Sequence, residues 1–309
     1  EMCIRDSNVW IITASMTVLA ICYTMIIPFL PIYLLELGVP KADVALWSGL
    51  VFGITFLIAG IMAPIWGKIA DNKGKKRMAL RAGFAIAVSY VLIGMVTDQY
   101  QLLMGRALVG FANGFYPAAM TMVSLSVDEK QVGRALGIFQ TGLILGNVIG
   151  PFLGGAVESV VGMRPVFYIS GIAVFIATLA VLFLVKEPKL EVENTTSKEQ
   201  SKQPVKATSL REDFKSVQEQ PVLVRLLWIY FFMQCVIMML QPILALYVGD
   251  MQGTMEGAAI ISGTILSIGG LAGSLTTNIW VRLGERRGYF RTISYLSLIH
   301  ISEPTRLLS

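Results

Sequence analysis

Residues 137–155 read GIFQTGLILGNVIGPFLGG, and this stretch decides the fold. It carries no charged residue and belongs to a longer apolar run. Gly146, Gly150 and Gly154 are four residues apart, so on a helix they share one face and leave it without side chains. A second helix can approach such a face closely, as helices in membranes often do. Pro151 is expected to bend the helix, because its ring clashes with the preceding turn and it lacks a backbone donor.

The composition of the whole chain favours a membrane protein. Hydrophobic residues make up 55% of 309 and charged residues only 15%, whereas a soluble domain carries about 25% charged residues. A bilayer core takes about 20 apolar residues as a helix, and backbone groups in lipid must bond within their own segment. The sequence therefore predicts an all-α polytopic protein. Its apolar runs are 9–35, 44–66, 82–97, 99–127, 135–157, 165–185, 226–249 and 257–281.

The basic residues predict the orientation. If the N-terminus is cytoplasmic, most lysines and arginines of the connections lie inside, Arg81 and the cluster before it included, and only Lys41 and Arg164 lie outside. The positive-inside rule thus favours a multi-pass protein of the bacterial cytoplasmic membrane with a cytoplasmic N-terminus. The net charge of +5 comes from loops between apolar runs, which favours a lipid bilayer over nucleic acid as the partner.

A polar segment divides the chain. Residues 187–222 are rich in Lys, Glu, Gln, Ser and Thr and are expected to form a cytoplasmic linker. Residues 8–186 then form a complete six-helix half, and 223–297 form about two to three helices of a second half. Residues 1–7 and 298–309 fit neither a membrane segment nor a cap. They resemble translated sequencing adapter, and we exclude them from the expected fold.

No pattern in the sequence indicates catalysis. The cysteines, Cys3, Cys22 and Cys235, are too scattered for a disulfide framework. The single histidine, His300, gives no metal cluster. No nucleophile–base pair or phosphate-binding loop is evident, so we expect no enzyme, no metal and no cofactor.

The connection between the second and third runs has a recognisable pattern. Residues 67–77 read GKIADNKGKKR, in which glycines allow a tight turn and Asp71 can pair with cations or with the positive end of a helix. An ordinary basic loop that only fixes topology is the alternative. In this position the pattern resembles the loop signature of the major facilitator superfamily, although Asn72 stands where the family usually has Arg. The resemblance implies a fold of two six-helix halves. It also implies that this loop stabilises one alternating-access state through Gly67, Asp71, Gly74, Lys75, Lys76 and Arg77.

Arg106 is a charge deep in the fourth apolar run. An intramembrane arginine is costly and by default suggests a functional site, with snorkelling from the outer end as the alternative. Arg106 followed by Gly110 resembles the fourth-helix motif of the same superfamily, which implies a role in proton coupling. Glu36, near the outer end of the first run, is the candidate proton acceptor, and a solvated helix end is its alternative reading.

The glycine pattern of the fifth run is also a family signature. Gly137, Gly146, Gly150, Pro151, Gly154 and Gly155 have the spacing of the antiporter motif of the drug:proton antiporters. This resemblance implies export, whereas generic small-residue packing is the alternative. Together with residues 28–38, 47–56 and 162–167, the motifs resemble those of MdtG-type bacterial multidrug exporters over residues 8–295.

Polar residues seven apart lie nearly on one helix face. Arg106 and Asn113, Gln140 and Asn147, and Gln234 and Gln241 form three such pairs. These stripes are expected to face a substrate cavity, with hydrogen bonding between helices as the alternative. The expected cavity residues are Asn113, Tyr116, Gln140, Asn147, Gln234, Met238 and Gln241.

The patterns together predict proton-coupled export of drug-like amphipathic small molecules by alternating access, by a monomer in the cytoplasmic membrane. Two alternatives remain at this point. One is a sugar or metabolite carrier of the same superfamily, and the other is a non-transporting membrane sensor or an inactive fragment.

Overall fold

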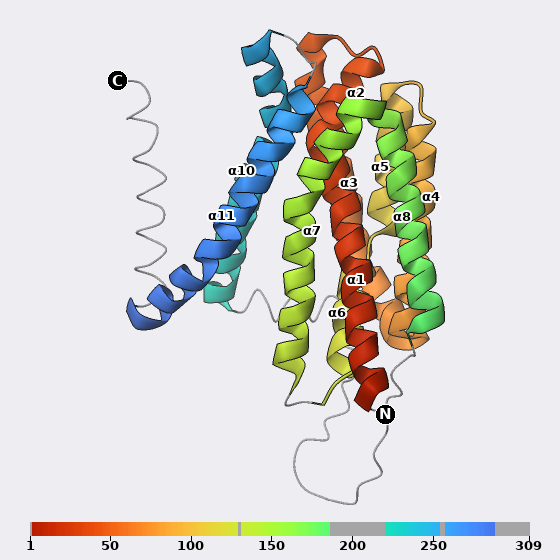
Figure 1. Ribbon diagram of the computed structural model, residues 1–309, viewed down its shortest axis with the longest axis vertical. Coiled ribbons are helices and arrows are strands. Elements are labelled where there is room, and N and C mark those ends of the chain that lie inside the picture. The colour runs from red at the N-terminus through yellow and green to blue at the C-terminus, as the bar shows by residue number, and fades with distance from the viewer. Residues whose placement is uncertain (1, 129–130, 186–219, 254–256, 288–309) are drawn as a thin grey trace, which may run out of the picture.

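The computed structural model describes residues 2–128, 131–185, 220–253 and 257–287, and every regular element in these ranges is a helix (Figure 1). This confirms the predicted all-α polytopic fold. The elements are α1 (Met2–Ile26), η1 (Ile27–Phe29), α2 (Leu30–Glu36), α3 (Lys41–Lys73), α4 (Lys75–Gly94), α5 (Gln99–Ala112), α6 (Phe115–Leu125), α7 (Val132–Val161), α8 (Met163–Leu184), α10 (Pro221–Gln252) and α11 (Ala258–Arg287).

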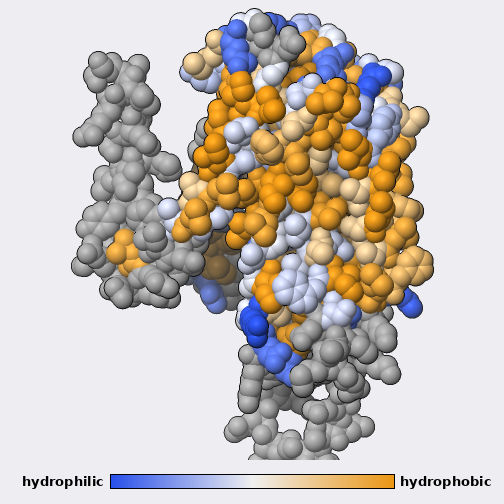
Figure 2. Space-filling view, viewed as in Figure 1, coloured by the Kyte–Doolittle hydropathy of each residue, from blue (hydrophilic) through white to orange (hydrophobic). Residues whose placement is uncertain are grey.

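The helices have the length and the surface of membrane spans. Within the described residues, 7 helical segments are long and apolar enough to cross a bilayer. Helix α10, 32 residues long, coincides with the predicted run 226–249. Large apolar side chains are exposed along most of these helices, and they cover the visible face between two hydrophilic ends (Figure 2).

Helix α1 forms the centre of the first half. Together with η1 and α2 it makes one span, Ser7–Glu36, that is mostly buried. Pro28 lies at the start of η1, directly after α1 ends, and Pro31 lies at the start of α2. Each junction falls there because proline cannot continue the backbone hydrogen bonds of a preceding helix. Residues 2–7 continue α1 as its first turns, and their suspected origin outside the native gene stays a prediction.

The fourth span is broken, although the sequence predicted one continuous run over 99–127. Helix α5 ends at Ala112 and α6 begins at Phe115. Pro117 cannot donate a backbone hydrogen bond to Asn113, and its ring clashes with that carbonyl in a continuous helix. Gly114 has φ +134°, a value that residues with a side chain rarely adopt. The Asn-Gly pair and the proline three residues later were the missed signal.

Helices α10 and α11 stand beside the bundle formed by α1 to α8. In Figure 1 they contact it near the upper end and diverge from α7 towards the lower end. The chain begins at the lower end and α8 ends there. Residues 187–219 of the predicted linker 187–222 lie outside the described residues. The whole segment 298–309 lies outside them as well.

Candidate functional site

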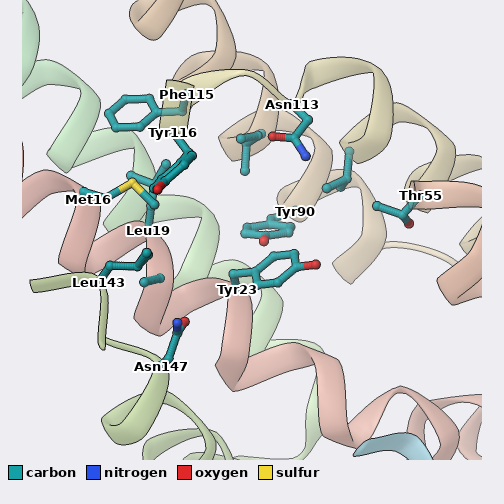
Figure 3. Close-up of a pocket in the computed structure, with 13 residues that line it drawn as sticks. Met16, Leu19, Tyr23, Thr55, Tyr90, Asn113, Phe115, Tyr116, Leu143 and Asn147 are labelled. Atoms are coloured by element: carbon teal, nitrogen blue, oxygen red, sulfur yellow. The ribbon is translucent and has the colours of Figure 1, made fainter. Parts of the chain in front are cut away.

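A cavity of about 350 Å³ lies in the middle of the first half (Figure 3). Five spans line it, and its wall is apolar apart from tyrosine, threonine and asparagine side chains. The lining residues that carry polar groups are Tyr23, Thr55, Tyr90, Asn113, Tyr116 and Asn147. Its apolar wall includes Met16, Leu19, Phe115 and Leu143. Such a mixture suits an amphipathic ligand.

The structure brings some of the expected cavity residues together and leaves others apart. Asn113, Tyr116 and Asn147 line the cavity. Gln140 is exposed on α7 and is not part of this lining. Gln234 and Met238 are half-buried on α10, away from the cavity, and the side chain of Gln241 lies outside the described part of the structure.

Two polar residues of the cavity were missed. The search for stripes used only arginine, asparagine and glutamine, so it passed over the hydroxyl groups of Tyr90 on α4 and Thr55 on α3. The Thr55 hydroxyl donates to the carbonyl of Arg106 at 3.1 Å as well as to that of Val51 in its own helix. A threonine that can satisfy itself within its helix gives no sequence signal of a contact with a neighbouring helix.

Arg106 is fully buried at 0% exposure, which excludes the snorkelling alternative. None of its three guanidinium nitrogens has a hydrogen-bond partner among the described residues. The guanidinium carbon lies 6.0 Å from the ring centre of Phe52, and the guanidinium group lies near the two cavity tyrosines, Tyr23 and Tyr90. Arg106 thus places a positive charge directly behind the cavity wall.

A second cavity, of about 560 Å³, runs between α3 and α6 towards the loop of residues 67–77. We call it the loop-side cavity. Trp66, Asp71, Lys75 and Thr121 are among its lining residues. Asn113 lines both cavities, so the break in the fourth span, between α5 and α6, lies where they meet; we call it the helix-four break.

The residues of the 67–77 loop have distinct contacts. Gly74 joins α3 to α4 with φ +95°. Asp71 forms an ion pair with Lys75 across this turn. Lys76 instead donates to the carbonyls of Leu182 and Val185, at 2.8 Å and 2.6 Å, and so caps the C-terminal end of α8. Gly67 lies in open space and Arg77 is exposed.

Glu36 ends α2 at the end of the bundle opposite the 67–77 loop. It is solvent-exposed and interacts electrostatically with Arg164 at the start of α8. Arg164 also donates to the carbonyl of Val96 at 3.3 Å. The structure therefore places Glu36 far along the bundle from Asp71 and close to a basic residue.

The glycine face of α7 packs on α1, which belongs to the same half. A Cβ added to Gly146 would lie 2.6 Å from the Cβ of Ala20, and one added to Gly150 or Gly154 would clash with Thr24 or Met25. Gly142, four residues before Gly146, extends this face against Thr13 and Thr17 and was missed although its spacing fits. Gly137 is exposed, and a Cβ added to it would meet no atom within 4 Å.

A different face of α7 meets α11 of the second half. A Cβ on Gly155 would lie 2.5 Å from the Ala259 carbonyl oxygen, and one on Gly263 would clash with the Pro151 carbonyl. The backbone N–H of Phe152 donates to the Ser267 hydroxyl at 3.1 Å. Gly155 and Pro151 thus hold the contact between halves, while Gly146, Gly150 and Gly154 hold α7 to α1.

Membrane spans around a central cavity, with a second helix group against one edge, define the class of helical membrane transporters. The chain belongs to the Major Facilitator Superfamily, whose family model matches residues 12–301. This confirms the resemblance inferred from the loop and glycine motifs, and it identifies a member of a transporter family and not an enzyme.

Proteins of known name and structure support this assignment. The chain is 37% identical over 267 residues to multidrug resistance protein MdtG of Proteus mirabilis (strain HI4320), covering 86% of this chain and 64% of that protein. The same protein of Klebsiella pneumoniae (strain 342) is 36% identical, with 86% and 62% covered. The chain therefore spans slightly less than two thirds of the length of these relatives.

Two solved structures have the same fold. One is a bacterial homologue of the human lysosomal transporter Spinster in an inward-facing, unoccupied conformation, with a TM-score of 0.69 and 21% identity over 92% of this chain and 63% of that one. The other is the peptide transporter POT in complex with alafosfalin, with a TM-score of 0.61 and 13% identity over 91% and 68%.

Proposed function

We propose that the protein exports drug-like amphipathic small molecules across the bacterial cytoplasmic membrane by alternating access. The observation that carries this proposal is the central cavity, where an apolar wall surrounds a few tyrosine and asparagine groups at mid-span. The kinship with proteins named for multidrug resistance supports a drug-like substrate.

The arrangement of the halves supports alternating access. They touch at one end through Gly155, Phe152 and the facing residues of α11, and they diverge at the end where the chain begins (Figure 1). If that end is cytoplasmic, as the basic residues Lys68, Lys73 and Lys76 indicate, the cavity opens inwards. Export then requires the α7–α11 contact to separate.

Proton coupling is the second part of the proposal. Arg106 would supply the buried charge beside the cavity, and Glu36, exposed at the end of α2, would exchange protons with the outside. Asp71, paired with Lys75 at the other end, is free to change partner when the halves move. The protein is proposed to act as a monomer, with protons and the exported molecule as its partners.

Ethidium or norfloxacin efflux from bacteria that express the full-length gene tests both parts. Expression should lower accumulation, and a protonophore should restore it. Unchanged accumulation would reject export, and a decrease that persists with the protonophore would reject proton coupling.

A further inference from the structure

The break in helix four leaves backbone carbonyls without partners in the middle of a membrane span. In a continuous helix the carbonyls of Phe111, Ala112 and Asn113 accept bonds from residues four positions on. The turn at Gly114 removes two of these donors from reach, and Pro117 has no N–H to supply the third. Carbonyls without partners cost several kcal/mol in lipid, so donors from neighbouring helices stabilise such a break.

Two side chains from neighbouring helices supply those donors. Trp66 of α3 donates its indole N–H to the carbonyl of Phe111 at 2.9 Å. Arg81 of α4 donates from Nη2 to the carbonyls of Ala112 and Asn113, at 3.2 Å and 3.1 Å. All three carbonyls of the break are therefore satisfied.

Trp66 and Arg81 also hold each other. The Arg81 guanidinium carbon lies 3.5 Å from the centre of the Trp66 ring, a close cation–π contact. The Trp66 ring packs edge-to-face on Phe111 with centroids 5.2 Å apart. Sequence analysis placed Arg81 only among the topology-determining charges, but its contacts indicate a more specific role.

A backbone hydrogen bond within the break fixes the direction of the Asn113 side chain. The backbone N–H of Gly114 donates to Asn113 Oδ1 at 2.7 Å, which determines which end of the amide is the oxygen. The amide nitrogen then points into the central cavity (Figure 3). This nitrogen carries two hydrogen-bond donors.

We propose that Arg81 and Trp66 are positioning residues that hold the helix-four break so that Asn113 offers its amide donors to an acceptor group on the substrate. This rests on the proposed function, and it narrows the substrate class to amphipathic molecules with a carbonyl, carboxylate or comparable acceptor. Arg81 and Trp66 act through Asn113 and do not line the central cavity.

The position of residue 113 can be measured without transport. Asn113→Cys, with Cys3 and Cys235 replaced by serine and Cys22 left in place because it is buried, should react with a water-soluble maleimide added to inside-out membranes. Adding Trp66→Phe, which removes the donor but keeps a ring, or Arg81→Met should slow this labelling at least tenfold, because the unsatisfied carbonyls rearrange the break. Equal labelling rates in all three proteins would overturn the proposal.

The same vesicles test the effect on the substrate. With Asn113 present, Trp66→Phe and Arg81→Met should raise the KM for proton-driven norfloxacin uptake about five- to tenfold, with little change in the maximal rate, as for one lost hydrogen bond. In an Asn113→Ala background neither substitution should change the KM further, because their effect passes through Asn113. Equal KM increases in both backgrounds would show a general structural role and contradict the proposal.

Matched controls separate this role from loss of a ring nitrogen or a charge. Trp47→Phe makes the same change at the other end of α3, and Lys73→Met removes a basic residue near the loop. Both should leave labelling and KM unchanged. Absence of norfloxacin uptake by the wild type would reject the proposed function for this compound, whereas the labelling rates still decide the positioning role.

Discussion

Arg106 is the residue whose environment departs furthest from what its chemistry requires. A buried charge without a partner is costly, and even a buried ion pair can often be replaced by well-packed apolar residues with no loss, or with a gain of about 1–4 kcal/mol, in stability. Arg106 has no hydrogen-bond partner among the described residues and packs near Phe52. Its retention at this cost is expected of a group needed for transport and not for folding.

We therefore expect Arg106→Met to raise the thermal unfolding midpoint in detergent and to abolish protonophore-sensitive efflux. Loss of an unpaired buried charge accounts for the first effect, and loss of the coupling charge accounts for the second. Circular dichroism melts and efflux rates measure the two. A lowered midpoint would show that Arg106 stabilises the fold, in contradiction to this view.

The glycines of α7 offer a second comparison between residues. Gly150→Ala places a Cβ against Thr24 inside the first half, and should destabilise the bundle by about 1–3 kcal/mol through overpacking. Gly155→Ala places a Cβ against α11, and should slow export by wedging the halves apart while the bundle keeps its stability. Melting midpoints and efflux rates measured at matched protein levels test this ranking, and the reverse ranking would contradict the assignment of the two faces.

At the scale of elements, the break between α5 and α6 depends on one backbone conformation. Gly114 has φ +134° and space for a Cβ, with only the Arg81 Nη2 at 3.4 Å. The cost of Gly114→Ala should therefore come from backbone strain, about 1–3 kcal/mol. Gly133→Ala, at an open position without positive φ, is the matched control.

Thermal unfolding of both variants measures this difference. A lower midpoint for Gly114→Ala with an unchanged one for Gly133→Ala is the expected result. If the two midpoints agree, helix four can absorb the substitution and the break is not held by this glycine.

At the scale of the whole molecule, the proposed export requires α7 and α11 to separate. A Cβ on Gly270 would lie 3.8 Å from the Cβ of Val148, a separation that suits a disulfide. We expect the double variant Val148→Cys and Gly270→Cys to cross-link under mild oxidation and to stop efflux, with recovery on reduction. A gel-shift assay with a thiol-reactive polymer and parallel efflux measurements follow both, with each single cysteine as the control. Full efflux by the cross-linked protein would show that this contact does not open.

The sequence alone determined the class of fold and the family. A backbone in lipid must satisfy its hydrogen bonds internally, so long apolar runs predict helices. The loop and glycine motifs that indicate the family are local in sequence, so they could be recognised directly. The cavity was predicted only in part, because periodicity gives the face of a helix but not which helix that face meets.

Only the tertiary structure decided those partners. It assigned Gly146, Gly150 and Gly154 to α1 and Gly155 to α11, brought Tyr90 and Thr55 to the cavity, and placed Gln140 outside its lining. It also showed that Arg81 donates hydrogen bonds to the carbonyls of the helix-four break. The physical reason is that helix periodicity follows from the local backbone, whereas the neighbour of each face depends on how all the helices pack, which a single sequence does not state.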